Sequence, residues 1–98
     1  MSKTTTPELP AELLRVLARL DRVEDVARLL SDLLTPAEIE ALGERWQIVQ
    51  RLTAGQSQRE VAAELGVSIT TVSRGSRQLK YGVGGIAMAQ RLIAKGRG

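Results

Sequence analysis

The chain has 98 residues and a net charge of +3, with neither cysteine nor histidine. This composition excludes disulfides, thiolate metal sites and imidazole general bases, and no apolar run reaches the roughly 20 residues of a membrane span. We therefore expect one cytoplasmic domain over residues 1–98 that is not an enzyme and holds no metal or cofactor. Because so short a chain leaves about a third of its unfolded surface exposed after folding, a partner subunit would stabilise it.

The charges are divided unevenly along the chain. Glu64 is the last acidic residue, so the first 65 residues hold eight cations and eleven anions, whereas the last 33 hold six cations and no anion. Such asymmetry predicts a polyanionic partner for the C-terminal third. A basic tail that merely contacts solvent is the alternative.

Two amphipathic helices are predicted after a polar, disordered arm at residues 1–6. Pro7 or Pro10 suits the first turn of the first helix, and Asp21, with Glu24 three residues later, suits a cap for the second. Apolar residues recur at helical spacing in this region: Leu13, Val16, Leu17, Leu20, Val23, Val26, Leu29, Leu30, Leu33 and Leu34. They cover more than one stripe, which predicts an interlocked homodimer built from residues 7–54; the alternative is a monomeric bundle.

A long helix is predicted from the run Thr35-Pro36-Ala37-Glu38, which has a threonine cap, proline at the first helical position and a glutamate that can reach back to the cap. Ile39, Leu42, Trp46 and Val49 then fall on one face, so we interpret the single tryptophan as a core residue rather than a ligand contact. Gly55 is a natural position at which this helix ends.

The segment 57–80 has the pattern of a helix-turn-helix. Ser57-Gln58-Arg59-Glu60 is a second capping-box pattern, Gly66 breaks the short helix that follows, and Ser68 can cap the next one. The residues expected to face inward are Val61, Leu65, Val67, Ile69, Val72 and Leu79. After a glycine-rich stretch, residues 84–95 predict a last short helix.

The outer face of the second helix of this pair combines short hydroxyls with long donors, which suits the major groove of double-stranded DNA. The start of the preceding helix would cross the DNA backbone. The candidate DNA contacts are Gln58, Arg59, Ser68, Ile69, Thr70, Ser73, Arg74, Arg77 and Lys80. The alternative is an exposed polar face with no partner.

Five blocks of sequence resemble the tryptophan repressor family in order and spacing over about residues 34–80. They are Leu34-Thr35-Pro36, Ala41-Leu42-Gly43-Glu44-Arg45, Ser57-Gln58-Arg59-Glu60, Glu64-Leu65-Gly66 and Arg74-Gly75-Ser76. The resemblance implies an all-α fold of six helices per chain, an intertwined homodimer, and palindromic operator DNA bound when L-tryptophan is present as corepressor.

The resemblance also implies a ligand pocket. Two arginines, Arg45 and Arg74, would sandwich the indole, and Arg74 would also hold the carboxylate; guanidinium groups suit both tasks. The other residues implied are Thr71 and Gly75 as pocket walls, Leu34 and Thr35 of the second subunit near the ligand's amine, and Gln78, which stands where the family commonly has a serine. This last departure leaves open whether the ligand is tryptophan or a related indole.

Two functional hypotheses follow. The leading one is a transcriptional repressor, associated with the nucleoid when bound to DNA, whose operator binding depends on L-tryptophan or an indole analogue. The alternative is a ligand-independent architectural or repressor-like protein that binds DNA mainly through phosphates. An enzyme is disfavoured because no nucleophile or metal motif accompanies the carboxylates.

Overall fold

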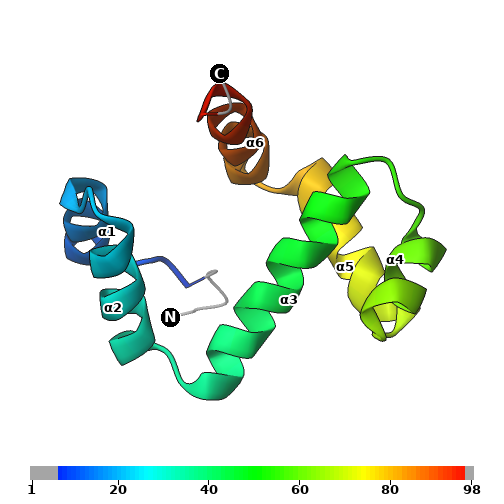
Figure 1. Ribbon diagram of the computed structural model, residues 1–98, viewed down its shortest axis with the longest axis horizontal. Helices are drawn as coiled ribbons and strands as arrows, with labels where there is room; N and C mark the ends of the chain where they lie inside the picture. The colour runs from blue at the N-terminus through cyan, green and yellow to red at the C-terminus, as the bar shows by residue number, and fades with distance from the viewer. Residues whose placement is uncertain (1–6, 97–98) are drawn as a thin grey trace, which may run out of the picture. The chain divides into compact units, whose positions relative to one another are not determined.

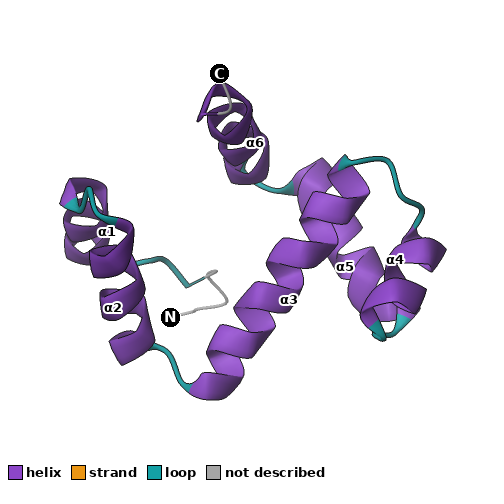
Figure 2. Ribbon diagram, in the orientation of Figure 1, coloured by secondary structure: helices purple, strands orange, loops and turns teal. Residues whose placement is uncertain are grey.

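The computed structural model describes residues 7–96, and these form six helices and no strand (Figures 1 and 2). The helices are α1 (Ala11–Arg19), α2 (Val23–Leu33), α3 (Pro36–Thr53), α4 (Gln58–Leu65), α5 (Ile69–Tyr81) and α6 (Gly85–Gly96). The predicted all-α class is therefore confirmed. The predicted arm at residues 1–6 lies outside the described residues, as do residues 97 and 98. By its internal contacts the chain divides into two compact units, Met1–Ile39 and Glu40–Gly98.

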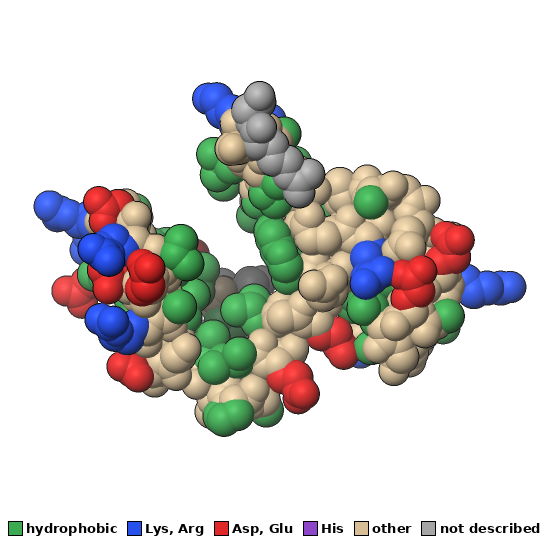
Figure 3. Space-filling view, in the orientation of Figure 1, with side chains coloured by type: hydrophobic (Ala, Val, Ile, Leu, Met, Phe, Trp, Pro, Cys, Tyr) green, Lys and Arg blue, Asp and Glu red, His purple; other side chains and the backbone are tan. Residues whose placement is uncertain are grey.

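In the first unit, α1 and α2 are amphipathic and neither contains a fully buried residue. Charged side chains gather on one side of this helix pair and hydrophobic ones on the other (Figure 3). Val23 and Leu33 are 82% and 54% exposed, respectively. Exposure of this many large apolar side chains in a single chain is typical of a surface that another subunit covers.

The start of α2 differs from the sequence prediction, because Arg22 rather than Asp21 is the N-cap residue and no side chain caps the helix. The Arg22 carbonyl accepts from the N–H groups of Asp25 and Val26, each at 3.1 Å. Glu24 pairs with the Arg22 guanidinium at 3.7 Å instead of reaching back to a cap. Two acidic residues in the first turn stabilise the positive end of the helix dipole, which makes a side-chain cap dispensable. Pro10 likewise is the N-cap of α1 and not part of its first turn.

The predicted start and end of α3 are confirmed. The Glu38 N–H donates to Thr35 Oγ1 at 3.2 Å, and Glu38 Oε1 accepts from the Thr35 N–H at 2.8 Å, which completes a capping box. At the other end Gly55 has φ of +103°, and its N–H donates to the Leu52 carbonyl at 3.0 Å. The Gln56 N–H donates to the Arg51 carbonyl at 3.2 Å, so the helix ends in a Schellman motif.

The predicted helix-turn-helix is confirmed in α4 and α5. Ser57 and Glu60 form the capping box of α4, with hydrogen bonds of 2.9 and 3.1 Å. Gly66 ends α4 in the left-handed conformation, with φ of +68°. Ser68 Oγ then caps α5 by accepting from the Thr71 N–H at 3.1 Å. Together these local signals produce two short helices joined by a tight turn.

The core of the second unit lies where α3, α4 and α5 meet. Ile48, Val61 and Val72, one from each helix, are at most 1% exposed and form one cluster. Leu52, Ala62, Leu65 and Val67 pack around it. The contact between α4 and α5 is the most extensive between helices in the described part of the chain. The core therefore fixes the helix-turn-helix onto the C-terminal half of α3.

Three residues expected in the core lie outside it. Trp46 is 45% exposed, Ile69 is 48% exposed and Leu79 is 36% exposed. Of the apolar residues predicted to bury one side of α5, only Val72 is fully enclosed. The periodicity identified residues that share a face correctly, but the neighbouring helices cover only part of each face.

The last helix, α6, begins at Gly85 and ends at Gly96, so it is shifted by one residue from the predicted range 84–95. A side-chain hydrogen bond joins it to α3, because Gln50 Nε2 donates to Gln90 Oε1 at 2.8 Å in a partly buried position. Ile86, one helical turn before Gln90, lines the cavity described below.

Candidate functional site

The outer face of α5 is exposed and basic. Arg74, Arg77 and Lys80 are all exposed, as is Arg59 on α4, and no acidic residue occurs in α5 or α6. Ile69 and Thr70 lie exposed at the start of α5, beside the N-cap. Unpaired N–H groups and the helix dipole make such a helix start favourable for a phosphate group. This surface therefore has the charge and the donors that a nucleic-acid backbone requires.

Two of the candidate DNA contacts are bonded to each other across the helix-turn-helix. The Ser73 hydroxyl of α5 donates to Gln58 Oε1 of α4 at 2.8 Å, in a partly buried position. The Gln58 amide nitrogen keeps its two donors. This hydrogen bond fixes the crossing of α4 and α5. Ser68, another candidate, has its Oγ engaged with the Thr71 N–H and, at 2.8 Å, with Thr71 Oγ1.

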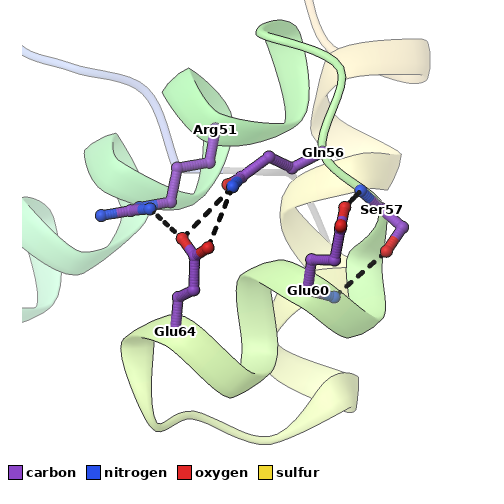
Figure 4. Close-up of polar contacts among 5 residues, drawn as sticks. All are labelled: Arg51, Gln56, Ser57, Glu60 and Glu64. Carbon is purple, nitrogen blue, oxygen red and sulfur yellow. Dashed lines mark hydrogen bonds and ion pairs between the residues drawn. The ribbon is translucent and has the colours of Figure 1, made fainter.

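The connection from α3 to α4 is held by a polar network that no sequence pattern predicted (Figure 4). Glu64 of α4 forms an ion pair with Arg51 of α3 and accepts from Gln56 Nε2 at 3.2 Å with each carboxylate oxygen. Arg51 and Glu64 are 13 residues apart, so no helical spacing relates them. The network joins α4, the first helix of the helix-turn-helix, to the end of α3.

A cavity of about 650 Å³ lies in the second unit between α3, α5 and the start of α6. Its volume falls within the range of about 300–1,000 Å³ that is typical of small-molecule sites. The residues that line it are Ala41, Leu42, Glu44, Arg45, Trp46, Ile48, Val49, Thr71, Arg74, Gly75, Gln78 and Ile86. Apolar walls are thus combined with two guanidinium groups, one carboxylate, one carboxamide and one hydroxyl.

Most of the ligand-binding candidates meet in this cavity. Its lining includes five of them: Arg45, Thr71, Arg74, Gly75 and Gln78. The other two, Leu34 and Thr35, belong to the first unit and were assigned to a second subunit. Within this chain Thr35 caps α3, and the Leu34 N–H donates to the Leu30 carbonyl at 2.9 Å.

Glu44, Trp46 and Ile86 also line the cavity, although neither the residue pattern nor the family resemblance predicted them there. Glu44 and Trp46 flank Arg45, and at about 100° per residue they lie on either side of it along α3. Gly75 has a packing role besides its place in the wall: a Cβ atom there would lie 2.6 Å from Ile48 Cγ2. The absence of a side chain at Gly75 therefore permits the close approach of α5 to α3.

Within residues 7–96, acidic side chains nowhere gather into a group of three that could bind a metal ion. No helix in the same range combines the length and apolar character required to cross a bilayer.

The chain is similar to known proteins of one family. Residues 10–92 match the family model described as Trp repressor protein. Three relatives named Trp operon repressor homolog show the range of similarity. The one from Photobacterium profundum is 42% identical over 87 residues, which cover 80% of this chain and 82% of the relative. The one from Xylella fastidiosa is 41% identical over 69 residues, which cover 69% of this chain and 75% of the relative. The one from Vibrio cholerae is 51% identical over 53 residues, which cover 53% of this chain and 52% of the relative.

Proposed function

The chain belongs to the Trp repressor family, whose members are regulators and not enzymes, and we propose that it is a sequence-specific DNA-binding repressor of transcription. It acts as a homodimer in the cytoplasm, on the nucleoid, with L-tryptophan or a related indole as corepressor. The observation that carries the proposal is the helix-turn-helix of α4 and α5, whose exposed face bears Arg74, Arg77 and Lys80 beside a ligand-sized cavity.

In the proposed complex α5 enters the major groove and α4 crosses the phosphate backbone. Arg59 contacts phosphate, and Arg74, Arg77 and Lys80 contribute base or backbone contacts. Ile69 and Thr70, exposed at the start of α5, can contact thymine methyl groups. The Ser73 hydroxyl is hydrogen-bonded to Gln58 Oε1, so the group of this pair that contacts DNA is the Gln58 amide nitrogen, which keeps its two donors.

The homodimer is proposed from the apolar side of α1 and α2. Neither helix has a fully buried residue, although most of their apolar positions fall on one face. A second copy of this chain would cover these side chains. The resulting dimer would present two copies of α5 related by a two-fold axis. Two such helices fit two half-sites about 34–36 Å apart, or a multiple of that distance.

The corepressor is proposed to occupy the cavity between α3 and α5. Arg45 and Arg74 approach it from different helices, and a planar guanidinium can stack on an indole or bind a carboxylate with two parallel hydrogen bonds. A ligand between these helices would favour one setting of α5 relative to α3. If that setting matches successive major grooves, ligand and DNA bind with positive coupling.

Sequence specificity is tested by selecting duplexes from a random pool with the purified protein and L-tryptophan. The proposal predicts enrichment of a two-fold symmetric motif, a strong preference for it over a scrambled duplex, and affinity that falls steeply with salt. Equal affinity for selected and scrambled duplexes would instead favour the architectural alternative, in which phosphate contacts account for all of the binding.

The ligand site is tested by calorimetric titration of L-tryptophan into wild type and Arg45→Ala. Loss of one stacked guanidinium should weaken binding by roughly 2- to 30-fold, the equivalent of about 0.5–2 kcal/mol. Arg77→Ala is the matched control, because it also removes one arginine but from a position on α5 that does not line the cavity. This variant should bind L-tryptophan with unchanged affinity. An Arg45→Ala variant that binds L-tryptophan like the wild type would refute the pocket assignment.

A further inference from the structure

The cavity is lined by ionisable side chains of both signs. Arg45 and Arg74 are its cations, and Glu44 is its single acidic residue. Glu44 comes from α3, directly before Arg45, and lies one helical turn ahead of Ile48, against which α5 packs at Gly75. Glu44 and the two arginines therefore line the same cavity.

Glu44 takes no part in the side-chain hydrogen bonds and ion pairs that join the described helices. Within residues 7–96, no ion pair or side-chain hydrogen bond involves its carboxylate. The other acidic residues of α3 differ from it, because Glu38 belongs to the capping box and Glu40 does not line the cavity. An acid without a structural partner, placed beside two arginines, is suited to a ligand that carries both charges.

From this charge arrangement we propose that Glu44 binds the ammonium group of the corepressor, while Arg45 and Arg74 hold its ring and its carboxylate. The inference rests on the proposed corepressor function and narrows the ligand to an aromatic α-amino acid, as opposed to an indole acid without an amine. The neighbouring polar wall, Gln78, can accept a hydrogen bond from an ammonium group through its amide oxygen, but it is neutral and offers no opposite charge. It follows that this chain contributes its own amine contact, independently of a second subunit.

The test is a two-by-two set of calorimetric titrations on the full-length protein. Wild type and Glu44→Gln are each titrated with L-tryptophan and with indole-3-propionate, which keeps the indole and the carboxylate but lacks the ammonium group. Glu44→Gln should weaken L-tryptophan binding by about 3- to 10-fold, between the effect of an exposed ion pair and that of a charge-assisted hydrogen bond. Binding of indole-3-propionate should stay unchanged or become tighter, because a carboxylate that repels it has been removed.

Two further variants separate this contact from a general charge effect. Glu40→Gln removes the same charge from α3 one turn earlier, outside the cavity, and should leave the preference between the two ligands unchanged. Glu44→Asp keeps the charge on a shorter side chain and should restore part of the preference for L-tryptophan. Circular dichroism and urea unfolding of each variant confirm that it is folded.

The possible outcomes distinguish this inference from the function on which it rests. A Glu44→Gln variant that weakens both ligands equally, or neither, would overturn the ammonium assignment while leaving the corepressor site intact. A wild type that binds neither ligand would overturn the corepressor function, and the assignment with it. Selective loss of L-tryptophan binding supports both.

Discussion

Replacement of Gly75 by alanine tests the packing that forms the cavity wall. The new Cβ atom would lie 2.6 Å from Ile48 Cγ2, whereas carbon atoms in contact prefer about 3.5–4.0 Å. Ile48 is 1% exposed and packs against Val61 and Val72, so it cannot move away without disturbing the core. Strain of this kind in a packed core costs about 1–3 kcal/mol.

The favourable effect of alanine on helix formation opposes this strain by about 0.5–1 kcal/mol. Gly43 provides the matched control, because it also lies inside a helix but has no atom within 4 Å of an added Cβ. Gly43→Ala should therefore raise the free energy of unfolding by about 0.5–1 kcal/mol. The difference between the two variants isolates the steric contribution, and Gly75→Ala should be less stable than Gly43→Ala by about 1–3 kcal/mol.

The assay is urea unfolding followed by circular dichroism, at one protein concentration because a dimer's stability depends on concentration. Ile48→Ala removes the obstructing methyl group, so Gly75→Ala should cost less in that background than in the wild type, by more than about 0.5 kcal/mol. If Gly75→Ala proves as stable as Gly43→Ala, then α5 does not approach α3 as closely as described and the cavity wall is wrongly placed.

Two further substitutions test the contacts that hold the helix-turn-helix of α4 and α5. Ser57→Ala removes one half of the α4 capping box and should lower the free energy of unfolding by about 1 kcal/mol, measured by urea unfolding; an unchanged value would mean that water replaces the cap. Ser73→Ala breaks the 2.8 Å hydrogen bond to Gln58 and should lower the free energy of unfolding by about 0.5–1.5 kcal/mol. The same substitution should have a smaller effect in a Gln58→Ala background. If the effects of the two substitutions are strictly additive, the two side chains act separately.

The features that the sequence predicted correctly depend on residues close together in the chain. Both capping boxes join residues three apart, and the turns at Gly55 and Gly66 require a left-handed conformation that glycine adopts without strain. The cap predicted at Asp21 was wrong even though it was local. There, acids in the first turn and the Arg22–Glu24 pair offered an alternative helix start.

Features that depend on the angle between helices could not be predicted. Helical spacing placed Trp46 on an apolar face, but whether that face is covered depends on where α5 and α6 lie. The ion pair of Arg51 with Glu64 and the contact of Gly75 with Ile48 join residues on different helices. The five ligand-binding candidates that line the cavity came from the family resemblance, whereas Glu44 became a candidate only when the cavity lining was known.

Control of DNA binding by a corepressor requires that the two ligands be coupled, and this coupling can be measured in both directions. The affinity for the selected duplex is measured with and without saturating L-tryptophan, and the affinity for L-tryptophan is measured with and without saturating duplex. Corepressor control predicts that each ligand strengthens binding of the other by the same factor, in the range of about 5- to 150-fold that is typical of allosteric coupling. A factor of one in both directions, with the duplex still bound, would contradict corepressor control.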